Sequence, residues 1–186
     1  MAGEIDDAIE RADRESFTRQ PPKTLQARIN FLIKQLKTTK AVAAELGVSQ
    51  RSVERYRKGE RKHPPKPIAD RIDDAVRQRW QPQVRKRRQK QAATTRGITV
   101  ETRARFGYTA PVGTTDDGRF RRLTVHLPPA YAQRLFDART TGASDQQMRG
   151  IIAEGLKEIY FQDGGSRALG LSDVTLNDID YLDLDY

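Results

Sequence analysis

Two adjacent threonines on a polar segment are the residues of this chain whose side chains could most directly carry chemistry. Thr114 and Thr115 lie between Gly113 and the acidic pair Asp116 and Asp117, in the stretch GTTDDG. An aliphatic hydroxyl on an exposed loop can be presented to the active site of another enzyme, where metal ions supply the activation that the loop lacks. The same residue types also make ordinary turns, in which Thr or Asp caps the next segment. The residues alone leave both interpretations open and favour the turn.

Conventional catalytic groupings are absent from the sequence. The 186 residues include no cysteine, which excludes disulfides, thiol nucleophiles and cysteine-bound zinc. The two histidines, His63 and His126, are too few for a histidine-rich metal site or a base relay. Neither a Gly-Lys-Thr phosphate loop nor a Ser-His-Asp arrangement occurs. We therefore expect no cofactor of its own.

Residues 39–58, TKAVAAELGVSQRSVERYRK, predict a helix-turn-helix that would place the protein on DNA. A short apolar-periodic helix ends at Gly47, where the turn needs a residue that tolerates positive φ, and Ser49 is a good N-cap for a second helix. Val53 and Tyr56 fall three apart on one face and anchor that helix inward. The polar side chains that remain outside, and that we expect to reach DNA in a major groove, are Gln50, Arg51, Arg55 and Lys58.

Positive charge is concentrated in the first half of the chain. Residues 1–96 carry 24 Lys and Arg against 12 Asp and Glu, whereas residues 97–186 carry 10 against 13. Such a basic half is typical of a module that faces phosphates. The proline-broken segment after the second helix predicts a loop along the phosphate backbone, with Arg61 and Lys62 as contacts. The run 84–96 holds six cations and no acid, which favours a phosphate clamp over a solvated helix face, and it begins with Arg85, Lys86, Arg87 and Arg88.

Apolar periodicity predicts the remaining elements. Helices are expected over residues 4–16 and 24–37 and from Pro67 to Trp80. From residue 97 the pattern changes, because residues 98–106 and 120–127 alternate apolar and polar positions and so predict two half-buried strands. An exposed loop joins these strands, and two further helices begin at the Pro128-Pro129 pair and at the Ser144/Gln147 capping box.

Two secondary interpretations concern the second half of the chain. Residues 119–161 have the order of a ribbon-helix-helix half, which would dimerise by pairing strands and turn Arg119, Arg121 or Arg122 toward a groove. The tail SDVTLNDIDYLDLDY alternates apolar residues with aspartate and slips in phase at Tyr181-Leu182, which predicts a bulged edge strand. Four tail carboxylates could hold a divalent metal, but without a glycine-containing ligand loop a solvated strand or an acidic partner for the basic half fits better; they are Asp178, Asp180, Asp183 and Asp185.

These patterns predict an α+β protein. We expect an all-helical helix-turn-helix domain over residues 1–66, a basic helix and linker over 67–96, and over 97–186 a small β-hairpin with two helices and an acidic terminal strand. No apolar run approaches the ~20 residues of a membrane span, and the charged N-terminal segment does not look like a signal peptide. An intracellular, soluble protein without a membrane partner is expected.

Several phrases of the sequence resemble one known family over nearly the whole chain. EIDDAIERADRE near the N-terminus, VAAELGVSQRSVERY in the helix-turn-helix, ITVETRARFGYTA followed by GTTDD, and IIAEGL with YFQDGG are similar to the telomere terminal proteins of Streptomyces linear chromosomes and plasmids (Tpg). So many shared sequence motifs along one chain are specific to a family.

The resemblance implies a protein that becomes covalently attached to the 5′ ends of linear replicons. A threonine hydroxyl would replace a nucleic-acid 3′-OH and prime DNA synthesis; it falls on Thr114, with Thr115 as the alternative. The implied partners are telomeric DNA, a telomere-associated DNA-binding protein and a DNA polymerase that brings the divalent metal. The ribbon-helix-helix interpretation adds a homodimer. The chain would act as a protein primer in the cytoplasm, at the nucleoid, and not as an enzyme. Single strands of the telomere would stack on Trp80 or Tyr56.

Two other classes of function use the same residues differently. A transcriptional or plasmid-replication regulator would bind DNA through the helix-turn-helix without any covalent attachment. A self-nucleotidylating enzyme would need its own carboxylate-bound metal, with the tail aspartates as ligands.

Overall fold

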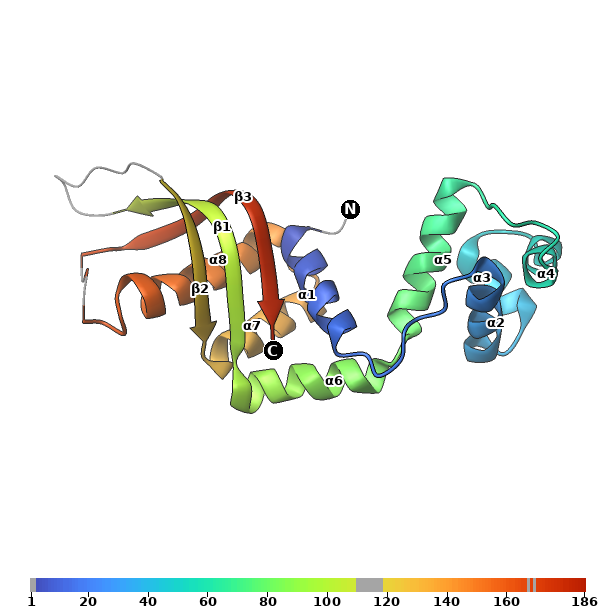
Figure 1. Cartoon of the computed structure of the whole chain (residues 1–186), viewed down its shortest axis with the longest axis horizontal. Coiled ribbons are helices and arrows are strands. Elements are labelled where there is room, and N and C mark those ends of the chain that lie inside the picture. The colour runs from blue at the N-terminus through green and yellow to red at the C-terminus, as the bar shows by residue number, and fades with distance from the viewer. Residues whose placement is uncertain (1–2, 110–118, 167, 169) are drawn as a thin grey trace. The chain divides into compact units, whose positions relative to one another are not determined.

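The computed structural model describes residues 3–109, 119–166, 168 and 170–186 (Figure 1). The chain forms two compact units. We call Phe17–Gln83 the helical unit, and Met1–Ser16 together with Val84–Tyr186 the sheet unit. The expected α+β architecture is confirmed, with helices first and then a three-stranded antiparallel sheet. Within the described residues, no helix is long and apolar enough to cross a membrane.

The helical unit consists of α2 (Leu25–Leu36), α3 (Thr39–Leu46), α4 (Gln50–Lys58) and α5 (Lys66–Arg79). Hydroxyl side chains define three of the helix starts, because each accepts a hydrogen bond from the backbone N–H three residues on. These N-caps are Thr24 (3.2 Å), Thr38 (3.0 Å) and Ser49 (3.2 Å).

The α3–α4 turn is the expected helix-turn-helix connection. Gly47 has φ +61°, a conformation that glycine adopts without strain, and its N–H closes α3 on the Ala44 carbonyl. Val53 and Tyr56 are buried as predicted, at 0% and 1% exposure. They pack in one apolar core with residues of the other three helices: Ile29, Leu32, Val42, Leu46, Ile72 and Val76. This core fixes the orientation of α4 within the helical unit.

The sheet unit has the strand order β2-β1-β3, from β1 (Ile98–Thr109), β2 (Arg119–Leu127) and β3 (Asp173–Asp185). Even-numbered residues from Ile98 to Phe106 are buried to 1% exposure or less, as the alternation predicts. Three helices pack on this face, as Figure 1 shows: α1 (Glu4–Glu15), α7 (Pro129–Thr140) and α8 (Asp145–Leu156). The other helical elements of the unit are α6 (Pro82–Gln91) and the π-helical turns η1 (Ala92–Arg96) and η2 (Lys157–Phe161). The odd-numbered residues of β1 therefore point away from the core.

Two irregularities interrupt β3, the edge strand that the tail was expected to form. Arg103 pairs with Tyr181 and the next residue, Ala104, pairs with Ile179, which skips Asp180. A second shift at the following β1 position skips Asp178. The bulge prediction is confirmed, with the extra residues slightly upstream of the phase slip at residues 181–182. Two insertions restore the original phase, so Val174 and Leu182 face the same core.

A buried ionic cluster joins α1, α6, α7 and Tyr186. Glu10 and Asp13 are 7% and 0% exposed. Glu10 accepts hydrogen bonds from Arg139 (2.6 Å) and from two nitrogens of Arg85 (3.3 Å each). Asp13 accepts one from the Tyr186 hydroxyl at 2.7 Å and has Arg139 at 3.6 Å. Because buried charges are costly without partners, each acid here requires these specific helices.

The division into units differs from the expected domain bounds. The first helix, expected within the 1–66 domain, packs in the sheet unit because its stripe of Ile5, Ala8 and Ile9 is fully buried there. The expected linker is also divided. Ile72 and Val76 of α5 belong to the helical core, whereas α6 carries Arg85 into the ionic cluster.

We predict that Asp13 makes stability depend on pH. Burial raises the pKa of the Asp13 carboxyl above its ordinary value, against the Tyr186 hydrogen bond and the charges of Arg85 and Arg139, which lower it. The folded state therefore binds more protons than the unfolded state above about pH 4, so this contribution is present at lower pH and is lost as pH rises through the folded pKa. Urea unfolding of the wild type and of Asp13→Asn should show the wild type losing stability relative to the variant as pH rises above about 4. A difference that grows in favour of the wild type would contradict the shift.

Candidate nucleic-acid interface

The outer face of α4 presents a compact set of cations. Arg51, Arg55 and Lys58 are exposed and lie on the side of the helix opposite the buried Val53 and Tyr56. A helix held by its inner face and basic on its outer face has the geometry that enters a major groove, where arginine pairs with guanine and lysine contacts phosphate. The structure therefore brings together the predicted recognition residues.

Gln50 is held in place at the first turn of α4. Its Nε2 donates to Thr39 Oγ1 at 2.9 Å and to Glu54 Oε1 at 3.2 Å. Thr39 is the first residue of α3, so the amide is fixed by both helices of the motif. A fixed glutamine amide is a suitable reader of an adenine edge, for which it would exchange these exposed bonds.

Glu60 forms ion pairs with two residues of this basic face. Its oxygens lie 3.8 Å from Arg55 Nε and 4.0 Å from Lys58 Nζ. All three side chains are at least half exposed, so these ion pairs are worth at most about 1 kcal/mol and can give way to a phosphate. In the segment that follows α4, Arg61 and Lys62 are exposed, and the Arg61 guanidinium lies 5.9 Å from the Tyr56 ring centroid.

The two aromatic rings expected to stack on bases are used inside the helical unit. Tyr56 is only 1% exposed, so its ring is closed to a base. Trp80 is half-buried; its ring packs edge-on against Phe31 at 5.0 Å between centroids, and its Nε1 donates to the Arg19 carbonyl at 3.1 Å. Apolar packing therefore closes Tyr56 to stacking, and at the partly exposed Trp80 it competes with stacking.

The basic run divides into internal and external residues. Arg85 is 13% exposed and binds the buried Glu10 within the sheet unit. Arg88 is half-buried, whereas Lys86 and Arg87 are exposed on α6. Arg85 therefore stabilises the fold, which differs from its predicted role in a phosphate clamp. Lys86 and Arg87 remain the candidates for phosphate contact.

Thr114 and Thr115 lie outside the described residues. The described strand ends on either side are Thr109 and Arg119, and the antiparallel pairing of β1 with β2 extends to Phe106 opposite Arg119. The segment 110–118 thus connects two strands whose positions are fixed by the core of the sheet unit.

The tail aspartates pair with arginines of their own unit. Asp180 lies 2.8 Å from Arg103, and Asp183 lies 3.0 Å from Arg11. Asp178 lies 3.5 Å from Arg105. In the described part of the chain no three Asp, Glu or His side chains gather as a metal site would require. Of these three arginines only Arg11 belongs to the basic half of the sequence, so the expected pairing of the tail with that half is limited here to Asp183.

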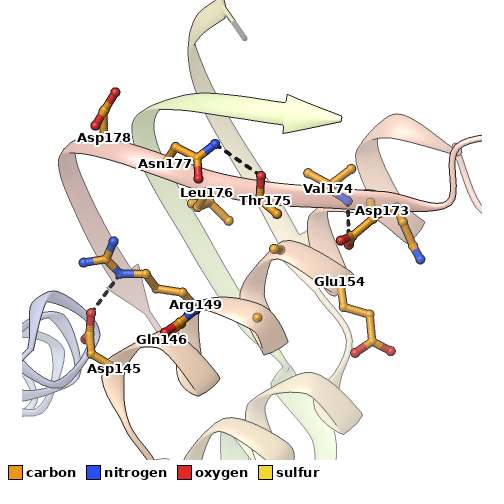
Figure 2. A pocket seen from close by; sticks show the side chains of 13 residues that line it. Asp145, Gln146, Arg149, Glu154, Asp173, Val174, Thr175, Leu176, Asn177 and Asp178 are labelled. Atoms are coloured by element: carbon orange, nitrogen blue, oxygen red, sulfur yellow. Dashed lines mark hydrogen bonds and ion pairs between the residues drawn. The ribbon is translucent and has the colours of Figure 1, made fainter. Parts of the chain in front are cut away.

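A groove of about 820 Å³ lies between α8 and the first half of β3, and Figure 2 shows the side chains that line it. The two aspartates Asp145 and Asp173 in its lining form hydrogen bonds with neighbouring protein groups. Asp145 accepts from Arg149 Nε at 2.8 Å and from the Ile5 backbone N–H at 2.9 Å, which caps α1. Asp173 accepts from the Val174 N–H at 2.9 Å. The groove therefore holds structural pairs and no nucleophile aligned with a base.

Comparison with protein-family models, with curated proteins and with solved structures finds no match to this chain. Functional inference therefore depends on the residues themselves and on the resemblance described above. Of these, the exposed face of α4 is the most complete constellation within the described residues.

We predict that Arg51 and Arg55 contribute directly to duplex binding. Arg51→Ala and Arg55→Ala should each cost about 1–3 kcal/mol if a bidentate base contact is lost. Arg57→Ala is the matched control, because Arg57 is an exposed arginine of α4 that lies nearer the buried side. Glu60→Gln should tighten binding, since it removes the carboxylate beside Arg55. Anisotropy titrations with a duplex oligonucleotide measure all four variants, and equal affinities for the two test variants and the control would refute the assignment.

We predict opposite phenotypes for neighbouring residues of α6. Replacing Lys86 and Arg87 by Gln should reduce the slope of log affinity against log salt by about 0.9 per lost phosphate contact, without changing thermal stability. Arg85→Gln should instead lower the unfolding free energy by about 1.5–3 kcal/mol, because Glu10 loses charged hydrogen bonds. If the salt dependence of the double variant equals that of the wild type, Lys86 and Arg87 make no phosphate contact and this part of α6 is only a solvated surface.

Proposed function

We propose that this protein is a telomere terminal protein, which binds telomeric DNA and becomes covalently linked to the 5′ ends of linear replicons. The observation that carries the proposal is the occurrence, in one chain, of an outward-facing basic recognition helix and of the GTTDDG connection between two paired strands. The family resemblance of the sequence supports the same conclusion. The helical unit would locate the DNA, and the sheet unit would present the hydroxyl.

The proposed reaction is transfer of a nucleotidyl group to Thr114. The threonine Oγ attacks the α-phosphorus of a deoxynucleoside triphosphate, a new P–O bond forms, the bond to the β-phosphate oxygen breaks, and pyrophosphate leaves. The hydroxyl proton passes to a base of the polymerase, whose metal ions stabilise the attacking and leaving oxygens. The added nucleotide then offers the 3′-OH from which synthesis continues.

The sheet unit suits an acceptor that must enter the cleft of another protein. β1 and β2 pair from Ile98 with Leu127 to Phe106 with Arg119, and their inward side chains are locked in the core. A connection anchored at both strands can be held by a polymerase while its own domain stays folded. The partners that follow from the proposal are telomeric DNA, a telomere-associated DNA-binding protein and a DNA polymerase.

We predict that Thr114→Val abolishes nucleotide attachment and leaves duplex binding intact, because valine keeps the branched shape but lacks the oxygen. Thr114→Ser should retain part of the activity, since a hydroxyl remains on a less restricted side chain. Thr115→Val is the matched control and should be mild. The measurement is transfer of labelled deoxynucleotide to purified protein with polymerase and telomeric template.

The same assay identifies the failures. Attachment that persists in Thr114→Val but is lost in Thr115→Val would move the acceptor by one residue. Persistence in both variants would remove it from this segment. A regulator without covalent chemistry would accept no label in any variant, and label transfer without polymerase would indicate a self-nucleotidylating enzyme.

A further inference from the structure

We propose that the open face of the three-stranded sheet binds single-stranded nucleic acid, with one base stacked on Phe120 and the adjoining phosphates held by Arg103 and Arg105. This surface belongs to the sheet unit and is separate from α4. Its binding does not depend on the proposed function. Only its use during priming rests on that proposal.

Phe120 is the first observation. It is 48% exposed although it lies in a strand, and among the described residues only Tyr160 is a comparably exposed large hydrophobic side chain. In β2 it alternates with the buried positions Leu123 and Val125, which places its ring on the face away from the helices. A single exposed apolar residue is common and carries no conclusion by itself.

The arginines around Phe120 give the ring a specific environment. The guanidinium carbons of Arg105 and Arg103 lie 5.3 Å and 5.9 Å from its centroid. Arg105 is the residue paired with Phe120 across the strands, and Arg103 pairs with Arg122 on one side and with Tyr181 on the other. The face thus combines an aromatic ring with a row of cations, which is the combination that binds a single strand by stacking and by phosphate contact.

Acidic residues on β3 compete for the same arginines. Asp180 pairs with Arg103 at 2.8 Å and Asp178 with Arg105 at 3.5 Å, and each carboxylate belongs to a residue that the β-bulges leave unpaired with β1. All four side chains are at least half exposed, so these pairs are weak and open to exchange with phosphate. The carboxylates also disfavour the denser charge of a duplex, which makes a single strand the better ligand.

The open face of the sheet lies on the same unit as the proposed acceptor threonine, which suggests that it holds the template strand. Arg105 and Phe120 are paired residues near the strand ends that the segment 110–118, with Thr114, connects. A template strand bound on the face would lie on the unit that carries the acceptor hydroxyl.

Binding of a fluorescent oligonucleotide of about 10 thymidines to the full chain tests the proposal. Phe120→Ala should weaken binding about five- to a hundredfold, as expected for the loss of one stacked base, whereas Phe120→Trp should keep it. Tyr160→Ala is the matched control, because Tyr160 is also an exposed aromatic residue, at 40% exposure. The double change Asp178→Asn and Asp180→Asn should strengthen binding, since it removes the competing carboxylates. Melting temperatures verify that the variants fold.

The outcomes separate the two sites. Equal affinity of Phe120→Ala and the wild type, or an equal loss in Tyr160→Ala, would overturn the inference. So would loss of thymidine binding in the Arg51→Ala, Arg55→Ala double variant, because the strand would then bind α4. If thymidine binding needs Phe120 while no variant accepts a nucleotide, the sheet surface stands and the proposed priming function fails.

Discussion

The buried charges of Glu10 and Asp13 constrain how three other segments of the sheet unit pack on α1. Two carboxylates at 7% and 0% exposure must find partners, and they find them on three different segments: Arg85 on α6, Arg139 on α7 and the Tyr186 hydroxyl after β3. Burial raises the pKa of the Tyr186 phenol, which keeps its proton available for donation to Asp13. Glu10 has two arginine partners, so removal of Arg85 leaves Arg139 in place and is expected to cost about 1.5–3 kcal/mol.

The ionic cluster and the candidate binding residues lie on the same segments of the sheet unit. Tyr186 ties the end of β3 to Asp13 on α1. The pairing of β3 with β1 places the bulge residues Asp178 and Asp180 beside the outward arginines. Because Arg85 is fixed to Glu10, α6 turns Lys86 toward solvent. On α6, the structural residue Arg85 therefore lies next to the candidate binding residue Lys86.

Much of the fold follows from local patterns in the sequence. Period-3.6 and period-2 apolar positions place the helices and strands, Gly47 places the turn, and Ser144 with Gln147 forms the predicted capping box. Contacts between distant residues do not follow from such patterns. The run that holds Arg85 looks uniformly basic, and only the tertiary position of Glu10 shows that this arginine is internal.

The candidate sites show the same limit. The outward residues of α4 can be predicted from its buried anchors. Tyr56 cannot both anchor α4 in the core and stack on a base, and its burial shows that it is an anchor. The alternation of β1 contains a signal for Arg103 and Arg105 at outward positions, but their convergence on Phe120 requires the strand register.

The most direct measurement of the central claim is mass spectrometry of native replicon ends after nuclease and trypsin digestion. Trypsin cleavage after Arg105 and Arg119 releases residues 106–119, which include Thr114. We predict that this peptide carries one deoxynucleotide, with fragment ions that place the added mass on Thr114. Replicon ends without the protein, or a nucleotide on a peptide outside residues 106–119, would contradict the account.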